Sequence, residues 1–406
     1  MRGPMSELDL STCPAPCAGL RWAELSDATL LVEADGEAVH VLNPGAGAVF
    51  ALCDGQRSLG GIAEELGALL GEGAPDAAAV ARWVQGACEE GYLVPGDGSA
   101  CSVPELAGQE LRGLARRLRE RGDIELSLRC QERVCVDLAE SAEEWLEFGE
   151  LAHILGRREL TRAAYERYLE LEPDDPEVEH MLLSLRDEAP PSRASDACVL
   201  QLYERFAPDY DRSMQDDLGY RAPGLLLQAL QPWLGEARAA LDVLDLGCGT
   251  GLTAERLRPW ARHLLGVDLS PDMVALAEER GSHDELATGE LLTWLQAATG
   301  DYDLVIACDV LIYFGELAPV LQAAAQRLRP GGRLAFTLER HAGSDWALTD
   351  SGRYAHSAPH VRELAEEVGL DVEHLEQEVL RHEYGEEVVG LSVVLAAPRA
   401  DVEARG

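Results

Sequence analysis

The chain contains no lysine, so its 34 Lys+Arg residues are all arginines. This absence excludes a Schiff-base lysine and the lysine of a Walker phosphate-binding loop. Basic residues are also outnumbered, because 73 Asp and Glu give a formal net charge of −39. Such acidity repels phosphate backbones and anionic lipids, so we expect neither nucleic acid nor a membrane as a partner. The charge keeps an Ala- and Leu-rich chain soluble, and attraction of a basic peptide is the alternative.

Long apolar runs are missing as well. No stretch reaches the roughly 18 residues that a membrane-spanning helix needs, and the segment Met1–Leu10 has no apolar signal core. The ten cysteines include no two CxxC pairs, so we expect no zinc ribbon and no other metal site. These absences predict a cytoplasmic protein with reduced cysteines. Its 406 residues suffice for about two to four domains.

Residues 20–96 are predicted to form a small αβ domain. Two short apolar runs, Thr29–Glu33 and Ala38–Leu42, flank Asp35-Gly36 and indicate a β-hairpin. Three helices and a closing strand should follow, which makes a winged-helix-like arrangement. The predicted N-caps of the three helices are Asn43, Ser58 and Asp76. Winged helices often bind DNA, but residues 1–100 carry 4 Arg against 15 Asp and Glu, which favours a peptide or protein ligand.

Three short motifs in this domain suggest a ligand. Leu42-Asn43-Pro44, the helix end Val49-Phe50-x-Leu52-x-Asp54-Gly55 and Gly91-Tyr92-Leu93 resemble the peptide-binding chaperone of pyrroloquinoline-quinone biosynthesis. That chaperone is the prototype of the leader-recognition domains of systems that modify ribosomal peptides. The resemblance implies that a precursor peptide adds as an extra strand to the small sheet and packs on the third helix. A purely structural domain is the alternative.

Residues 105–188 are predicted to be wholly helical. A unit starting at Ala142 fits the 34-residue register of tetratricopeptide repeats, which it resembles. The matching positions are Trp145, Gly149, Tyr165 and Pro173. Thr161 and Tyr168 depart from the small residues expected there. Both a protein-binding concave face and a packed connector stay open.

From residue 197 to 398, apolar strands alternate with helices, which predicts an α/β domain with a parallel sheet. The run Leu241–Leu246 is followed by Gly247-Cys248-Gly249-Thr250-Gly251 and then by a helix. Glycines in such a turn let a ligand lie close to the backbone. A second strand ends at Asp268, where a carboxylate could accept both hydroxyls of a ribose, and a third strand covers Asp303–Asp309.

The motifs LDLGCGTG, GVDLS, DLVIACDVL and LRPGG occur in this order and resemble class I S-adenosylmethionine-dependent methyltransferases. The flanking segments Tyr203–Asp211, Leu218–Pro223 and Arg353–Ser357 resemble bacterial methyltransferases that carry an N-terminal tetratricopeptide segment. The resemblance implies a Rossmann-like α/β fold and S-adenosylmethionine as the cofactor. An inert nucleotide-binding fold is the alternative.

The same resemblance implies the residues around the cofactor. Gly247, Gly249 and Gly251 would surround its methionine moiety and ribose, Asp245 would face its amino group, and Asp268 would hold the ribose. Further contacts are expected from Leu269, Met273 and Glu290 at the adenine, from Tyr220 and Arg221 as a cover or carboxylate grip, and from Asp309.

Catalytic groups depend on the acceptor. Methyl transfer from a sulfonium is an in-line displacement, so the enzyme must align the acceptor and exclude water. A carboxylate acceptor needs no base, whereas an amine or hydroxyl does. His356, beside Tyr354 in a loop-like stretch, is the candidate base, with a structural role as the alternative. Asp309 and Tyr313 should border the acceptor pocket, since ligands bind beyond the carboxyl ends of parallel strands.

Three functions remain open from the sequence. The first is a methyltransferase that binds the leader of a ribosomal peptide and methylates its core, with O-methylation of a side-chain carboxylate as one form of the reaction. The second is a methyltransferase for a small molecule, with regulatory N-terminal domains. The third is a non-enzymatic scaffold that binds peptide and partner proteins.

Overall fold

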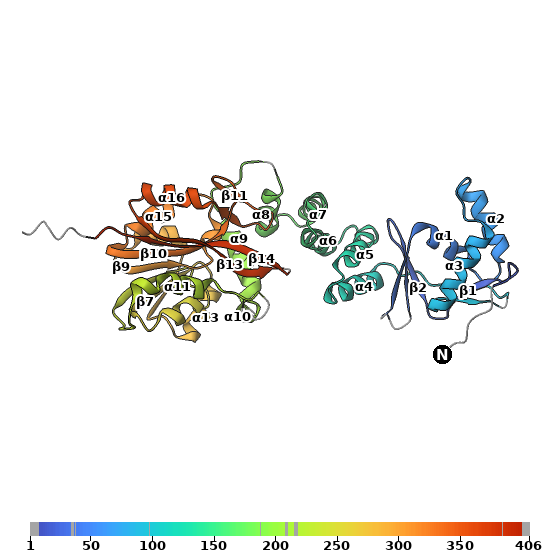
Figure 1. Cartoon of the computed structure of the whole chain (residues 1–406), viewed down its shortest axis with the longest axis horizontal. Coiled ribbons are helices and arrows are strands. Elements are labelled where there is room, and N and C mark those ends of the chain that lie inside the picture. Colours follow the sequence, from blue (N-terminus) through green and yellow to red (C-terminus); the bar gives the residue numbers. More distant parts are fainter. Residues whose placement is uncertain are drawn as a thin grey trace, which may run out of the picture. The chain divides into compact units, whose positions relative to one another are not determined.

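The computed structural model describes residues 8–399, apart from residues 34, 35, 37, 97, 187, 208–209, 215–217 and 384. The chain divides into two compact units, Met1–Glu172 and Pro173–Gly406, which we describe separately (Figure 1). This division falls inside the predicted helical segment 105–188. Within the described residues, no helix combines the length and apolar character needed to cross a membrane.

A three-stranded antiparallel sheet organises the first unit. β3 (Thr29–Val32) pairs with β2 (Arg21–Glu24) on one side and with β4 (Val39–Leu42) on the other. The predicted hairpin of β3 and β4 is confirmed, although Asp35 of its predicted turn lies outside the described residues. A second, two-stranded ribbon of β1 (Pro14–Pro16) and β5 (Leu93–Pro95) contains the predicted closing strand.

The three predicted helices and their N-caps are confirmed. Each cap side chain accepts a hydrogen bond from a backbone N–H in the first turn, with Asn43 bonded to Ala46 at 2.9 Å and Asp76 bonded to Ala79 at 2.7 Å. Such a bond satisfies a donor that the helix itself leaves unpaired. The helices are α1 (Pro44–Leu52), α2 (Leu59–Leu70) and α3 (Ala77–Glu90). They share one apolar cluster with Leu31 and Leu42 of the sheet.

Two helix pairs complete the first unit. They are α4 (Gln109–Glu120) with α5 (Ile124–Asp137), and α6 (Ala142–Ile154) with α7 (Arg158–Leu171). The two pairs therefore repeat with a period of 33 to 34 residues. Gly149 of α6 faces Tyr165 of α7 so closely that a Cβ at Gly149 would lie 2.4 Å from ring atom Cε1.

The small sheet is covered on both faces. Leu30 and Val32 share a second apolar cluster with α4 and α5, opposite the face that packs on α1 to α3. Residues 104–106 run along the outer edge of β2, where Trp22 N–H donates to the Pro104 carbonyl at 3.1 Å and Leu106 N–H donates to the Trp22 carbonyl at 2.6 Å. Within the part of the chain that the structure describes, no segment pairs with the outer edge of β4.

A nine-stranded mixed sheet forms the centre of the second unit. Five neighbouring strands run parallel, in the order β8, β7, β6, β9 and β10. β14 pairs antiparallel with β10 and also with β13. The strands are β6 (Leu241–Leu246), β7 (Ala261–Asp268), β8 (Glu285–Thr288), β9 (Tyr302–Ala307), β10 (Leu328–Arg340), β11 (Trp346–Leu348), β12 (Tyr354–His356), β13 (Asp371–Glu383) and β14 (Glu386–Ala396).

Helices cover both faces of this sheet, each over its own apolar cluster. Figure 1 shows α15 and α16 on one face and α11 on the other. The helices are α8 (Pro176–Ser184), α9 (Asp196–Phe206), α10 (Tyr210–Arg212), α11 (Ala222–Leu234), α12 (Leu252–Leu257), α13 (Pro271–Arg280), α14 (Leu291–Ala297), α15 (Ala318–Ala325) and α16 (Ala358–Glu367). The predicted Rossmann-like α/β architecture is confirmed, and it brings the carboxyl ends of β6, β7 and β9 to one edge.

Candidate active site

The glycine-rich turn after β6 has left-handed backbone at all three predicted glycines, with φ of +62° at Gly247, +52° at Gly249 and +89° at Gly251. Side chains rarely adopt this conformation. A Cβ at Gly247 would lie 2.2 Å from Cγ2 of Val310, so the turn packs closely against the chain after β9. A Cβ at Gly249 would meet nothing within 4 Å. The turn is therefore open to a ligand at Gly249.

Asp268 lies at the end of β7, beside this turn. Its Oδ2 accepts a hydrogen bond from Gly249 N–H at 2.8 Å, and its Oδ1 accepts one from Ser270 N–H at 2.9 Å. Burial raises the pKa of Asp268, and the two backbone donors oppose that effect. The carboxylate is thus fixed in orientation while oxygen lone pairs remain for a ligand.

A cavity opens over the turn and Asp268. The predicted site residues that line it are Gly247, Gly249, Asp268, Leu269, Glu290, Asp309 and Tyr313. Glu290 also N-caps α14, accepting from Leu292 N–H at 3.0 Å and Thr293 N–H at 2.8 Å.

Other predicted cofactor contacts do not line the cavity. Asp245 is buried, with its Oδ2 3.3 Å from Nε2 of His283, and Met273 is also buried. A Cβ at Gly251 would lie 3.2 Å from Cδ of Arg280.

Tyr220 and Arg221 do not line this cavity, and their expected role as a cover stays a prediction. The hydroxyl of Tyr220 lies 3.4 Å from Sγ of Cys308, and Arg221 is exposed at the start of α11. The cavity is instead walled by Tyr203 of α9 and Tyr210 of α10. Both tyrosines belong to the sequence motif Tyr203–Asp211, so a signal for them was present.

Polar contacts hold α10 against the glycine-rich turn. The hydroxyl of Thr250 donates to Oδ1 of Asp211 at 2.6 Å, and Arg280 forms an ion pair with the same carboxylate. Arg280 also donates to the backbone carbonyl of Thr250. These contacts link α10, which carries Tyr210, to the glycine-rich turn.

His356 and Tyr354 are not in the loop that the sequence predicted. They lie on β12, fully buried, and neither lines the cavity. Nε2 of His356 is 2.8 Å from the carbonyl of Phe314, and the Tyr354 hydroxyl donates to the carbonyl of Pro191 at 2.9 Å. Burial lowers the pKa of His356 to about 4. This geometry assigns His356 to the core and gives it no acceptor to deprotonate.

The buried His356 predicts an acid-sensitive core. An unfolded histidine binds its proton near pH 6.5, whereas this one does so only near pH 4, so stability falls as the pH drops through that window. The full loss is about 3 kcal/mol. Hydrogen exchange of β10 and β12 amides should accelerate from pH 7 to pH 5, after correction for intrinsic rates, and His356→Asn should reduce that acceleration. An equal acceleration in both proteins would contradict the assignment.

A second cavity adjoins the first. The two share four lining residues: Tyr203, Tyr210, Asp309 and Tyr313. Of these, Asp309 and Tyr313 were predicted to border an acceptor pocket. The hydroxyls of Tyr203 and Tyr313 lie 3.1 Å apart. The second cavity is also lined by Arg353, Arg381 and Glu383, which do not line the first.

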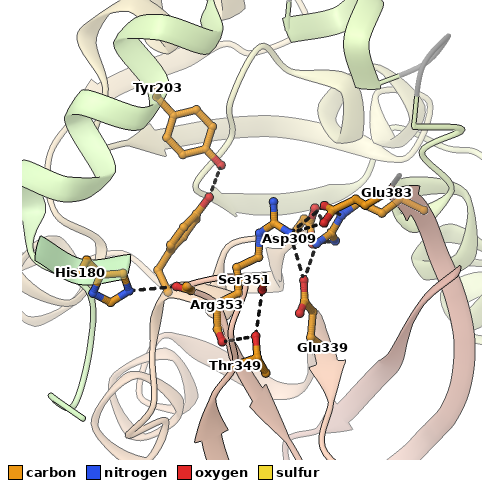
Figure 2. Close-up of polar contacts among 11 residues, drawn as sticks. His180, Tyr203, Asp309, Glu339, Thr349, Ser351, Arg353 and Glu383 are labelled. Atoms are coloured by element: carbon orange, nitrogen blue, oxygen red, sulfur yellow. Dashed lines mark hydrogen bonds and ion pairs between the residues drawn. The ribbon is translucent and has the colours of Figure 1, made fainter. Parts of the chain in front are cut away.

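Arg381 is the centre of a buried ion cluster at this junction. Its Nη1 lies 3.1 and 3.3 Å from the two carboxylate oxygens of Asp309, its Nε donates to Glu383 at 2.8 Å, and its Nη2 contacts Glu339. Figure 2 shows the three carboxylates converging. Asp309 itself has φ +60°, a strained value for a residue other than glycine, and such strain gathers at functional sites.

Comparison with known proteins agrees with this geometry. A family model described as a methyltransferase domain matches residues 244–334. Methyltransferase-like protein 27 of Homo sapiens is 40% identical over 115 residues, which is 28% of this chain and 46% of that protein. The malonyl-[acyl-carrier protein] O-methyltransferase of Hahella chejuensis is 31% identical over 191 residues, which is 41% of this chain and 66% of that protein. The chain thus spans about half to two thirds of the length of these relatives.

Solved structures also show similarity. N-methyltransferase NodS from Bradyrhizobium japonicum, solved with S-adenosyl-L-homocysteine, has 22% identity and a TM-score of 0.41, covering 49% of this chain and 98% of its own. The [4+2]-cyclase SpnF has 18% identity and a TM-score of 0.42, covering 51% of this chain and 98% of its own.

The match to the family model spans β6 to the first part of β10, and so contains the glycine-rich turn and Asp268. The open backbone at Gly249 would let the cofactor lie close to the turn, and the fixed carboxylate of Asp268 would accept hydrogen bonds from its ribose. The chain therefore carries a class I S-adenosylmethionine-dependent methyltransferase domain.

Proposed function

We propose that the chain transfers a methyl group from S-adenosylmethionine in the first cavity to an acceptor in the second. The observation that carries this proposal is the wall that the cavities share, formed by Tyr203, Tyr210, Asp309 and Tyr313. When bound, the cofactor supplies an electrophilic methyl group on a sulfonium, which leaves as a neutral thioether. Asp268 would accept hydrogen bonds from its ribose, and the shared wall would align the acceptor and exclude water.

The tyrosines of this wall are suited to orient a substrate. Burial raises the pKa of Tyr203 and Tyr210 well above the usual value. Both phenols are therefore neutral at physiological pH and able to donate hydrogen bonds, while their rings exclude water. They give the reaction a dry, preorganised pocket rather than a base.

We further propose that the acceptor belongs to a ribosomally made precursor peptide, bound by the first unit. Both faces of the small sheet and the outer edge of β2 are already covered, whereas β4 has no partner on its outer edge among the described residues. Val41 of β4 is 46% exposed, and the adjoining His40 ring packs on Tyr92 with centroids 5.0 Å apart. An extended leader would add to β4 by main-chain hydrogen bonds. This matches the resemblance to leader-recognition domains.

The helix pairs α4–α5 and α6–α7 fit the same proposal. Their period of 33 to 34 residues and the close approach of Gly149 to Tyr165 support a tetratricopeptide-like segment. In a chain that binds a leader at one end and methylates at the other, such a segment would act as a spacer that raises the local concentration of the core peptide.

A single proline tests the leader site. Glu33 N–H donates to the Ala38 carbonyl, so in the antiparallel alternation the N–H of Val41 points away from β3, toward the open edge. Val41→Pro removes that outward donor, and edge strands tolerate proline. We expect turnover of the precursor peptide encoded beside the gene to fall about tenfold or more, measured by mass spectrometry of the methylated product.

Val41→Thr is the matched control, because it keeps the N–H and should methylate the full peptide as the unchanged chain does. Affinity for S-adenosylhomocysteine and turnover of the leaderless core peptide should be equal in both variants. If Val41→Pro methylates the full peptide at the normal rate, the β4 edge is not the leader site.

A small-molecule acceptor is the second candidate. Both cavities lie wholly within the second unit, and two of the curated relatives are named as malonyl-[acyl-carrier protein] O-methyltransferase and ubiquinone biosynthesis O-methyltransferase. Methylation of a free metabolite at a rate that Val41→Pro leaves unchanged would favour this candidate.

A further inference from the structure

We infer that the methyl acceptor is a carboxylate and that Arg353 binds it; this rests on the proposed methyl transfer between the two cavities. Arg353 lines the second cavity, and its side chain is 26% exposed there. Its Nη1 donates to both carboxylate oxygens of Glu383, at 2.7 and 2.8 Å. Figure 2 shows the Arg353 side chain extending toward this carboxylate.

The other edge of the Arg353 guanidinium is unused. Its Nε and Nη2 have no hydrogen-bond acceptor among the residues that the structure describes. These two groups carry parallel N–H donors, the arrangement that matches the two oxygens of a carboxylate. A carboxylate bound there keeps lone pairs on both oxygens after accepting.

The remaining charged groups of the second cavity are already paired. Arg381 directs its nitrogens to Asp309, Glu339 and Glu383. Glu383 accepts from both arginines; burial alone would raise its pKa, but the two arginines lower it on balance. Among the described lining residues, the Nε and Nη2 edge of Arg353 is therefore the charged hydrogen-bonding group that stays available to a substrate.

The same lining lacks a free base, within the described residues. Asp309 and Glu383 are held by arginines, and burial raises the pKa of the Tyr313 phenol. An amine or alcohol would have to lose a proton to such a base, whereas a carboxylate is ionised at pH 7. One carboxylate oxygen forms a bond to the methyl carbon as the carbon–sulfur bond breaks with its electron pair on sulfur. The products are a methyl ester and S-adenosylhomocysteine, and no proton moves.

Tritiated S-adenosylmethionine and degenerate peptide pools test the acceptor class with the full chain. The pools differ at one fixed central position: Asp and Glu, their isosteres Asn and Gln, or Lys and Ser. We expect label in the acidic pool alone, and mild alkali should release it as volatile methanol, because esters hydrolyse and N-methyl groups do not. Label in the Lys and Ser pool, or alkali-stable label, would overturn the carboxylate while leaving peptide methylation in place. Absence of label from all pools would overturn both.

Arg353→Gln tests the binding residue. We expect KM for the best acidic peptide, and its Kd measured by calorimetry with S-adenosylhomocysteine present, to rise about 10- to 100-fold. Affinity for S-adenosylhomocysteine should stay within about twofold, because Arg353 does not line the first cavity. Arg353→Lys, which keeps a charge beside Glu383, should recover part of the peptide affinity and serves if the glutamine variant does not fold.

Arg362 of α16 offers the matched control, since it is exposed and lines neither cavity. Arg362→Gln makes the same change in charge and should bind the acidic peptide normally. Normal peptide affinity in Arg353→Gln, or an equal loss in both variants, would refute the assignment of Arg353.

Discussion

Replacing Arg381 by methionine should lower the free energy of unfolding of the second unit by roughly 3–5 kcal/mol. The side chain is 2% exposed and contacts Asp309, Glu339 and Glu383. Its removal would leave three buried or partly buried carboxylates with Arg353 as their one remaining cation in this cluster. Urea unfolding followed by tryptophan fluorescence would measure the loss.

Arg333→Met is the control, because Arg333 is also buried but its partner Glu373 is 43% exposed and would stay hydrated. If both variants lose the same free energy of unfolding, the three carboxylates left by Arg381 carry no added cost.

Asp268→Ala should weaken the binding of S-adenosylhomocysteine by about 10- to 150-fold, or by more if both ribose hydroxyls bond to the carboxylate. A hydrogen bond to a charged group contributes about 1.5–3 kcal/mol, and this carboxylate is held in place by Gly249 and Ser270. Isothermal titration calorimetry with the full chain would give the affinity. Binding equal to that of the unchanged protein would remove the foundation of the methyltransferase assignment.

Asp272→Ala serves as its control. Asp272 lies four residues further along, is exposed in the first turn of α13 and does not line the cavity. It carries the same charge, so a general electrostatic effect on the ligand would affect both variants. We expect its affinity to be unchanged.

Local signals in the sequence predicted the elements well. Asn43, Ser58 and Asp76 each begin a helix, because an N-cap satisfies donors of its own first turn and needs no distant partner. The glycine-rich turn and Asp268 were likewise predicted at strand ends that the fold places side by side.

The acceptor side could not be predicted in the same way. Arg381 and Asp309 are 72 residues apart in the sequence, and strands β14 and β10 lie between β13 and β9 in the sheet, so only the folded structure brings the two side chains together. The segment around β12 was recognised, but the choice within it was wrong. All three residues of β12 are buried, Tyr354 and His356 among them, whereas Arg353, which precedes the strand, lines the second cavity.

The boundary between residues 96 and 105 shows a further limit. Composition separates a small αβ domain from a helical segment, yet both pack on the same sheet, from opposite faces. Burial of a strand on its second face depends on helices that come much later in the chain. A hairpin pattern alone does not reveal it.

The strand-like pairing of residues 104–106 with β2 has a consequence for how this protein could have been assembled during evolution. A gene fusion or recombination event that ended just after β5 would strip one edge of the small sheet and uncover one of its faces. An orphaned edge of this kind invites self-association. The shortest block that keeps this sheet edge and this face covered therefore runs from β2 through α5.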